Sequence, residues 1–353
     1  MKEIVSLIEI SSYAGERFDL AQAGGGNSSV KYDNGEMLIK ASGCTLSELN
    51  KDKGYSRVDN IKIKNIVKDD ALESLSKRDM ESYVAERIKQ ATLDSKNRPS
   101  IETLLHSLLS KYTLHTHPIV VNMIVVLKNW REVLSKIFED DAIVLVEYKT
   151  PGIELALALS HELKREKREN SIIFLQNHGL IVSSNKEEDI VYLTEYVLEK
   201  IETYLSINMS KYKTVTKLTA LFNGVYNSTE ISYLSEDVVL NRKILMDKSL
   251  FFTSPFAPDA LVYCGRKALE LQNLEDKEPL ENYLESYLMM PKIILFENKI
   301  FIRAINIKKA KEIEEVLKFH IMVLDNQRDI CFLDNDELNY LSNWEAEKYR
   351  ATL

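Results

Sequence analysis

Two histidines alternate along one short segment, in Leu114-His-Thr-His-Pro118. Side chains two residues apart point to the same face of a β-strand, so a strand here would present His115 and His117 side by side. His178, in Gln176-Asn-His-Gly179, supplies a third imidazole in a chain with only six histidines. Three neutral imidazoles bind a divalent ion and leave coordination positions open, as in catalytic zinc sites. We therefore predict a metal site formed by His115, His117 and His178.

Glu102 is the candidate general acid or base. It lies in Pro99-Ser-Ile-Glu-Thr-Leu-Leu-His106, where its neighbours are apolar apart from Thr103. Burial among such neighbours raises the pKa of a carboxyl group and suits it to proton transfer beside a metal. The apolar spacing predicts a helix over residues 101–109, with Ser100 as its cap. The alternative is a solvated charge near a helix N-terminus, where an anion is favoured.

Two glycine-bearing segments are candidates for anion binding. The first, residues 23–31, has three successive glycines followed by Asn-Ser-Ser, and the second, residues 40–45, contains Ser-Gly. Glycine lets the backbone approach a ligand closely, and exposed N–H groups form an anion nest. Neither segment has the spacing of a Walker or dinucleotide motif, and each alone could be a flexible turn. The predicted phosphate or substrate site comprises Gly26, Asn27, Ser28, Ser42, Gly43 and Ser100.

The composition of the 353-residue chain is that of a soluble globular protein, with 45% hydrophobic and 28% charged residues. A net charge of −8 argues against nucleic-acid binding. No apolar run reaches transmembrane length and the N-terminus lacks a signal-peptide pattern, so we expect no membrane partner. The three cysteines are odd in number and widely spaced, which favours reduced thiols and a cytoplasmic location.

Strand and helix signals alternate through the first two hundred residues. Expected strands cover residues 37–41, 112–117, 142–146, 172–175 and 180–183, and expected helices cover 77–91, 101–109, 152–164 and 187–205. The expected elements do not alternate in the regular strand-helix-strand order of a parallel sheet. We therefore predict an α/β fold, an α/β/α sandwich with a mainly antiparallel central sheet.

The last third of the chain contains a weak repeat. Residues 292–303 resemble residues 171–182 without a gap, as strand, turn and strand, and a helix over about 308–323 follows. Lys299 then takes the position of His178. Chance similarity between two such units is the alternative. We predict a metal-binding catalytic domain over residues 1–206 and an α/β domain over 207–353, a degenerate copy without metal ligands.

The motifs together resemble the class II aldolase and adducin family over residues 15 to 205. The matching segments are Gly-Gly-Gly-Asn-Ser-Ser-Val-Lys (24–31), Lys-Ala-Ser-Gly (40–43), Pro-Ser-Ile-Glu-Thr-Leu-Leu-His (99–106), His-Thr-His-Pro (115–118), Tyr-Lys-Thr-Pro-Gly (148–152) and Leu-Gln-Asn-His-Gly-Leu (175–180). The segments at 24–31 and 99–106 are similar to the aldolase half of bifunctional rhamnulose-1-phosphate aldolase/dehydrogenases. Residues 251–260 and 340–348 resemble the same proteins more loosely. The chain ends where a dehydrogenase domain would begin, so no nicotinamide activity is expected.

The resemblance implies roles for individual residues. It implies zinc on His115, His117 and His178, with manganese or cobalt as alternatives, and Glu102 as the catalytic acid or base. It implies phosphate binding by Asn27, Ser28, Ser42, Gly43 and Ser100. Fuculose-phosphate aldolases have two serines before the glutamate, whereas here Ile101 follows Ser100.

The expected activity is retro-aldol cleavage of a ketose phosphate. A metal holding the carbonyl and a neighbouring hydroxyl oxygen would stabilise the enediolate left when the carbon–carbon bond breaks. Epimerisation, decarboxylation or dehydration of a related sugar phosphate remain alternatives, as does a non-catalytic, adducin-like interaction module. The expected partners are a small sugar phosphate and further copies of the chain, in a homo-oligomer of two or four subunits.

Overall fold

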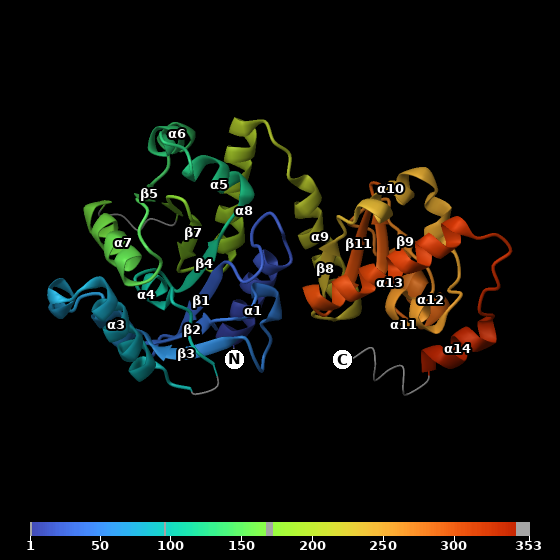
Figure 1. Cartoon of the computed structure of the whole chain (residues 1–353), viewed down its shortest axis with the longest axis horizontal. Coiled ribbons are helices and arrows are strands. Elements are labelled where there is room, and N and C mark those ends of the chain that lie inside the picture. Colours follow the sequence, from blue (N-terminus) through green and yellow to red (C-terminus); the bar gives the residue numbers. More distant parts are fainter. Residues whose placement is uncertain (1, 95–96, 167–171, 344–353) are drawn as a thin grey trace. The chain divides into compact units, whose positions relative to one another are not determined.

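The computed structural model describes residues 2–94, 97–166 and 172–343. The chain divides into two compact units, Met1–Met209 and Ser210–Leu353 (Figure 1). Residue 171, where the first copy of the repeat begins, and residues 344–348 of the tail lie outside the described residues. Among the described residues, no helix is both long enough and apolar enough to cross a membrane.

The first unit is built around a seven-stranded sheet of order β3-β2-β1-β4-β7-β6-β5. Every neighbouring pair is antiparallel except β5 and β6, which are parallel. The strands are β1 (Asn27–Lys31), β2 (Glu36–Lys40), β3 (Tyr55–Asp59), β4 (Tyr112–Thr116), β5 (Ile143–Val146), β6 (Ile172–Leu175) and β7 (Gly179–Ser184).

Helices cover both faces of this sheet (Figure 1). One face packs against α1 (Lys2–Gly15), α5 (Ile119–Val125), α6 (Trp130–Ile137) and α8 (Glu188–Leu205). The other packs against α2 (Asn60–Ile66), α3 (Lys77–Ala91), α4 (Thr103–Ser107) and α7 (Ile153–Glu166). The predicted α/β/α sandwich with a mainly antiparallel sheet is confirmed.

The alternation of side chains along β4 determines which face of the sheet carries His115. Leu114 belongs to the core beneath α1 and α8, so its neighbour His115 points to the opposite face. On that face His115 lies between Asn27 of β1 and Ile181 of β7, its partners in the two adjoining ladders. The sheet therefore presents His115 to the α4 and α7 layer.

The second unit contains a four-stranded sheet of order β8-β11-β10-β9. Its strands are β8 (Ile231–Leu234), β9 (Leu269–Glu270), β10 (Ile293–Phe296) and β11 (Lys299–Ala304). Its helices are α9 (Ser210–Tyr226), α10 (Val238–Met246), α11 (Pro258–Cys264), α12 (Glu278–Tyr287), α13 (Ile307–Asn326) and α14 (Asn335–Asn343). Helices α10, α11 and α13 share a core on one face of the sheet.

The predicted hairpin and helix are present in this second unit as β10, β11 and α13. The likeness extends further than the sequence indicated. The order β4-β7-β6-β5 in the first sheet has the same connectivity as β8-β11-β10-β9 in the second. In both, the last pair alone is parallel. Ile172 faces the α8 core as Ile293 faces the α13 core. The two half-sheets thus share their strand order and pairing directions, and a duplicated half-unit stays a prediction.

The ungapped match at the turn is wrong. Leu175 pairs with Gly179 across a three-residue turn, whereas Phe296 pairs with Lys299 across a two-residue turn. Lys299 therefore corresponds to Gly179, and His178 has no counterpart because the second turn is one residue shorter. The β8 strand leads into α10 as β4 leads into α5. Aligning the two helix starts places Leu234 and Glu236 at the positions of His115 and His117.

Candidate active site

The three predicted histidines converge at the C-terminal end of β4. The Nε2 atom of His115 lies 3.0 Å from Nε2 of His117 and 3.3 Å from Nε2 of His178. One ring nitrogen from each of the three lies within 4.8 Å of the others. Nitrogens about 2.0–2.1 Å from a tetrahedral zinc ion are separated by roughly 3.3 Å, so the spacing fits one ion.

The protonation of these rings also fits a metal. His115 Nδ1–H donates to the carbonyl oxygen of Leu180 at 3.0 Å, which leaves the Nε2 lone pair facing the other two rings. Burial lowers the pKa of His115 well below its usual value, and neighbouring His117 and His178 add to the shift. Burial likewise lowers the pKa of His117 to about 4 and that of His178. Lone pairs of neutral rings repel across such distances, whereas a shared cation would bind them.

Glu102 completes the cluster. Its Oε1 atom lies 3.3 Å from His115 Nε2 and 3.4 Å from His178 Nε2. Burial raises the pKa of Glu102 to about 7, although the nearby Lys40 ammonium and a hydrogen bond from Asn27 act to lower it. Near neutral pH such a carboxyl group can both give and accept a proton.

Two contacts join the α4 segment to strand β1, and their spacing is the same along both elements. Glu102, at the start of α4, contacts Asn27, and His106, four residues later, shares a hydrogen bond of 2.7 Å with Ser29 Oγ. Four helical residues rise about 6 Å and two strand residues about 6.6 Å, so the two spacings coincide. This match sets Glu102 over the end of β1, beside the histidines.

The predicted helix over residues 101–109 is shorter in the structure. Helix α4 spans Thr103–Ser107, and Glu102 occupies its N-cap position. Ile101, predicted to face the core, is 62% exposed. Ser100 lies beside the helix start, where its Oγ accepts a hydrogen bond from the Glu102 N–H at 3.3 Å.

Within the first glycine segment, the structure separates residues that the sequence grouped together. Gly26 has a φ of +78°, and a Cβ there would lie 2.9 Å from the carbonyl oxygen of His115, so glycine is required. Asn27 points to Glu102. The structure corrects the prediction that Ser28 belongs to the substrate site. Its Oγ lies 2.6 Å from Ser11 Oγ of α1, buried on the opposite face of the sheet. Its hydroxyl is not available to a ligand near the histidines.

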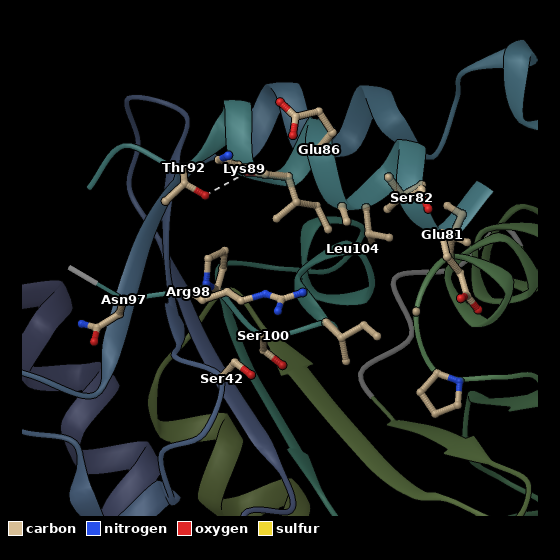
Figure 2. A pocket seen from close by; sticks show the side chains of 18 of the residues that line it. Ser42, Glu81, Ser82, Glu86, Lys89, Thr92, Asn97, Arg98, Ser100 and Leu104 are labelled. Carbon is tan, nitrogen blue, oxygen red and sulfur yellow. Dashed lines mark hydrogen bonds between the residues drawn. The ribbon is translucent and has the colours of Figure 1, made fainter. Parts of the chain in front are cut away.

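Two of the three remaining predicted phosphate residues border a large pocket of about 1360 Å³. Ser42 and Ser100 line it, and their backbones are linked through Arg98, whose carbonyl oxygen accepts from Ser42 N–H at 2.8 Å. The adjacent Gly43 is exposed, has a φ of +84° and has open space where a Cβ would lie. Figure 2 shows Ser42 and Ser100 close together on one wall of this pocket.

Two residues that the sequence did not single out belong to this region. Figure 2 shows the exposed Arg98 side chain reaching into the pocket above Ser100, and the structure gives its guanidinium no hydrogen bond or ion pair among the described residues. Lys40 is buried at the end of β2, and its Nζ donates to the carbonyl oxygen of Cys44 at 2.7 Å. The backbone hydrogen bond from Ser42 to Arg98 brings the two segments together, and Lys40 lies close enough to Glu102 to lower its pKa.

The sheet and the three-histidine cluster are those of a class II aldolase-like domain. Residues 6–205 match the sequence profile described as "Class II Aldolase and Adducin N-terminal domain". The chain therefore belongs to the class II aldolase and adducin family. Membership and the histidine cluster together are consistent with a divalent-metal site of the kind typical of class II aldolases.

Several solved structures are similar to part of this chain. The N-terminal class II aldolase domain of a conserved protein from Thermoplasma acidophilum is 22% identical, with a TM-score of 0.49 over 57% of this chain and 93% of that one. A sugar-phosphate aldolase from Thermotoga maritima is 16% identical, with a TM-score of 0.42 over 58% and 95%. An L-fuculose-1-phosphate aldolase from Thermus thermophilus is 17% identical, with a TM-score of 0.38 over 58% and 94%. No curated protein matches the chain.

Proposed function

We propose that the chain is a zinc-dependent class II aldolase that cleaves a ketose phosphate. The observation that carries this proposal is the position of Glu102. Its carboxyl group is buried, has a pKa raised to about 7, and lies 3.3 and 3.4 Å from the Nε2 atoms of two of the three convergent imidazoles. A proton-exchanging group at the rim of a metal site is what aldol chemistry requires.

A divalent ion on the three histidines would supply positive charge that stabilises a ketose carbonyl oxygen as it becomes negative. In cleavage, a hydroxyl group loses its proton to solvent and becomes the carbonyl group of the released aldehyde. The carbon–carbon bond breaks, and its electron pair remains on the carbon next to the ketone. In this proposal protonated Glu102 gives that carbon its proton, and ionised Glu102 removes it in the direction of synthesis.

The proposed substrate class, a ketose phosphate, is based on the resemblance to the long aldolase-like proteins related to rhamnulose-1-phosphate aldolases. The test is a screen of ketose phosphates with the zinc-loaded protein, with coupled detection of dihydroxyacetone phosphate or lactaldehyde. Cleavage of at least one substrate is expected. Epimerised, decarboxylated or dehydrated products would replace the aldolase assignment by one of the related activities. Absence of bound metal from the purified protein would favour an interaction module.

We also propose that the chain forms a dimer or tetramer, because closed symmetric homo-oligomers are the commonest assemblies of soluble enzymes. Light scattering and enzyme assays across a dilution series would test this. A fully active monomer at nanomolar concentration would contradict it.

Arg98 is expected to bind the phosphate group of the substrate. Its exposed guanidinium, which has no hydrogen-bond or ion-pair partner among the described residues, enters the pocket beside Ser100 (Figure 2). The next residue is Ile101, where fuculose-phosphate aldolases have a second serine. Arg98→Ala should raise KM for a phosphorylated substrate about 10-fold or more, because a charge-assisted hydrogen bond is lost, and should change kcat little. Lys89→Ala, which removes another exposed cation from the same pocket, is the control and should have a small effect. Equal KM changes in both variants would contradict the assignment.

A further inference from the structure

His117 is held in a different way from the other two histidines. His115 lies within β4, whereas His117 follows the end of that strand. Its imidazole is enclosed by two glycine backbones. A Cβ on Gly25 would lie 2.8 Å from His117 Nδ1, and a Cβ on Gly179 would lie 3.2 Å from His117 Cδ2. The position of the His117 ring therefore depends on the positions of the backbone at Gly25 and at Gly179.

The backbone around His117 is tied to the segment formed by residues 17–25. The N–H of His117 donates to the carbonyl oxygen of Leu20 at 2.9 Å, and the N–H of Ile119 donates to that of Asp19 at 2.9 Å. Pro118, between them, has no N–H group. Both N–H groups that flank Pro118 thus bind the 17–25 segment, which also supplies Gly25 beside the ring.

The 17–25 segment has its own buried anchor. The fully buried Arg17 donates to both carboxylate oxygens of Asp19, from Nε at 3.0 Å and from Nη2 at 2.6 Å. Its Nη1 pairs with Glu195 of α8, which also accepts from Tyr13 OH at 2.6 Å. The carbonyl oxygen of Arg17 accepts from the N–H groups of Leu20 and Ala21. A buried guanidinium that makes three charge-assisted hydrogen bonds allows the segment few alternative positions.

We propose that Arg17 and Asp19 are positioning residues for His117 and that, through it, they set the affinity of the site for a divalent ion. The inference rests on the proposed metal site. Groups behind metal ligands commonly affect metal affinity by 10–100-fold, because they fix the orientation of the ligand. Arg17, Asp19 and Glu195 are distant in sequence from the His-Thr-His motif, and only the fold connects them to it.

The test measures zinc dissociation constants by competition with a chelator of known affinity, together with the melting temperature of each metal-free protein. Gly25→Ala should weaken zinc binding about 10-fold or more, because the new Cβ displaces the His117 ring. Gly24→Ala is the matched control, because a Cβ there meets no atom within 4 Å, and its affinity should stay within about twofold of the wild type.

The ion pair is tested by Asp19→Asn and by the milder Arg17→Lys, which are expected to weaken zinc binding by about 10–100-fold. The control is Asp141→Asn, which breaks the contacts of Asp141 with Tyr196 and Lys200 of α8, in the same unit. This control should lower the melting temperature but leave zinc affinity unchanged. Unchanged affinity in Gly25→Ala, Asp19→Asn and Arg17→Lys would overturn the inference.

A double-mutant cycle separates positioning from general destabilisation. In a His117→Ala background, where we expect His115 and His178 to bind zinc weakly, Asp19→Asn should cause no further loss of affinity. If the affinity losses of Asp19→Asn and His117→Ala multiply in the double variant, the ion pair acts independently of His117. That result would overturn this inference but not the proposed function. A wild-type protein that binds no zinc would overturn the proposed function as well.

Discussion

His117→Ala is expected to reduce bound zinc from roughly one ion per chain to a small fraction of that value. Two imidazoles and a carboxylate remain, but the loss of one of three converging nitrogens removes the arrangement that favours a tetrahedral ion. Catalytic activity should fall with metal content. Elemental analysis by mass spectrometry after gel filtration measures the occupancy.

The control for this substitution is His161→Ala. His161 is a surface histidine of α7 whose side chain is 76% exposed, so its removal should leave zinc content unchanged. The stronger test is the triple alanine variant of His115, His117 and His178. Full occupancy in that variant would show that the metal binds elsewhere.

Glu102→Gln is expected to lower kcat about 100-fold or more while zinc content stays unchanged. Glutamine keeps the size of the side chain and much of its hydrogen bonding, but it cannot exchange a proton. The buried carboxyl group, with its pKa raised to about 7, is the group that this change removes. Steady-state kinetics on the ketose phosphate found in the screen, with metal analysis of the same sample, makes the measurement.

Glu86→Gln is a suitable control, because Glu86 is an exposed carboxylate that lines the neighbouring pocket. It should retain nearly normal turnover. If Glu102→Gln also turns over at a near-normal rate, another group transfers the proton and the role proposed for Glu102 is wrong.

The sequence predicted the features that depend on local alternation. The spacing of His115 and His117 predicted that both would lie on one face, and their ring nitrogens do converge, although β4 ends at Thr116 and does not include His117. If the same alternation is applied to Asn27, Ser28 and Ser29, Ser28 is expected on the opposite face of the sheet from the other two. The three glycines favoured a loop interpretation, so the β1 strand that begins at Asn27 was missed, and with it the burial of Ser28 against α1.

Other features depend on contacts between distant segments, which local patterns do not report. Helix α1 was missed, although it packs on the sheet and contributes Ser11. Helix α4 is shorter than its apolar spacing predicted. Ile101 is exposed there, whereas Glu102 turns inward to meet Asn27. The common connectivity of the two sheets became visible only through strand pairing, because the turn lengths differ by one residue.

His178 lies 63 residues after His115 in the sequence, and it meets His115 and His117 only when β4 and β7 pair. The unfolded chain therefore lacks the three-ligand site and keeps only the neighbouring His115 and His117, so zinc binds the folded state more tightly than the unfolded one. At a free concentration 100 times the dissociation constant, this linkage contributes about 2.7 kcal/mol to the stability of the first unit. Among its described residues the second unit has no comparable cluster of side chains that could hold a metal ion. A chelator should accordingly lower the melting temperature of the first unit and leave that of the second unchanged, so calorimetry can detect the metal without any substrate.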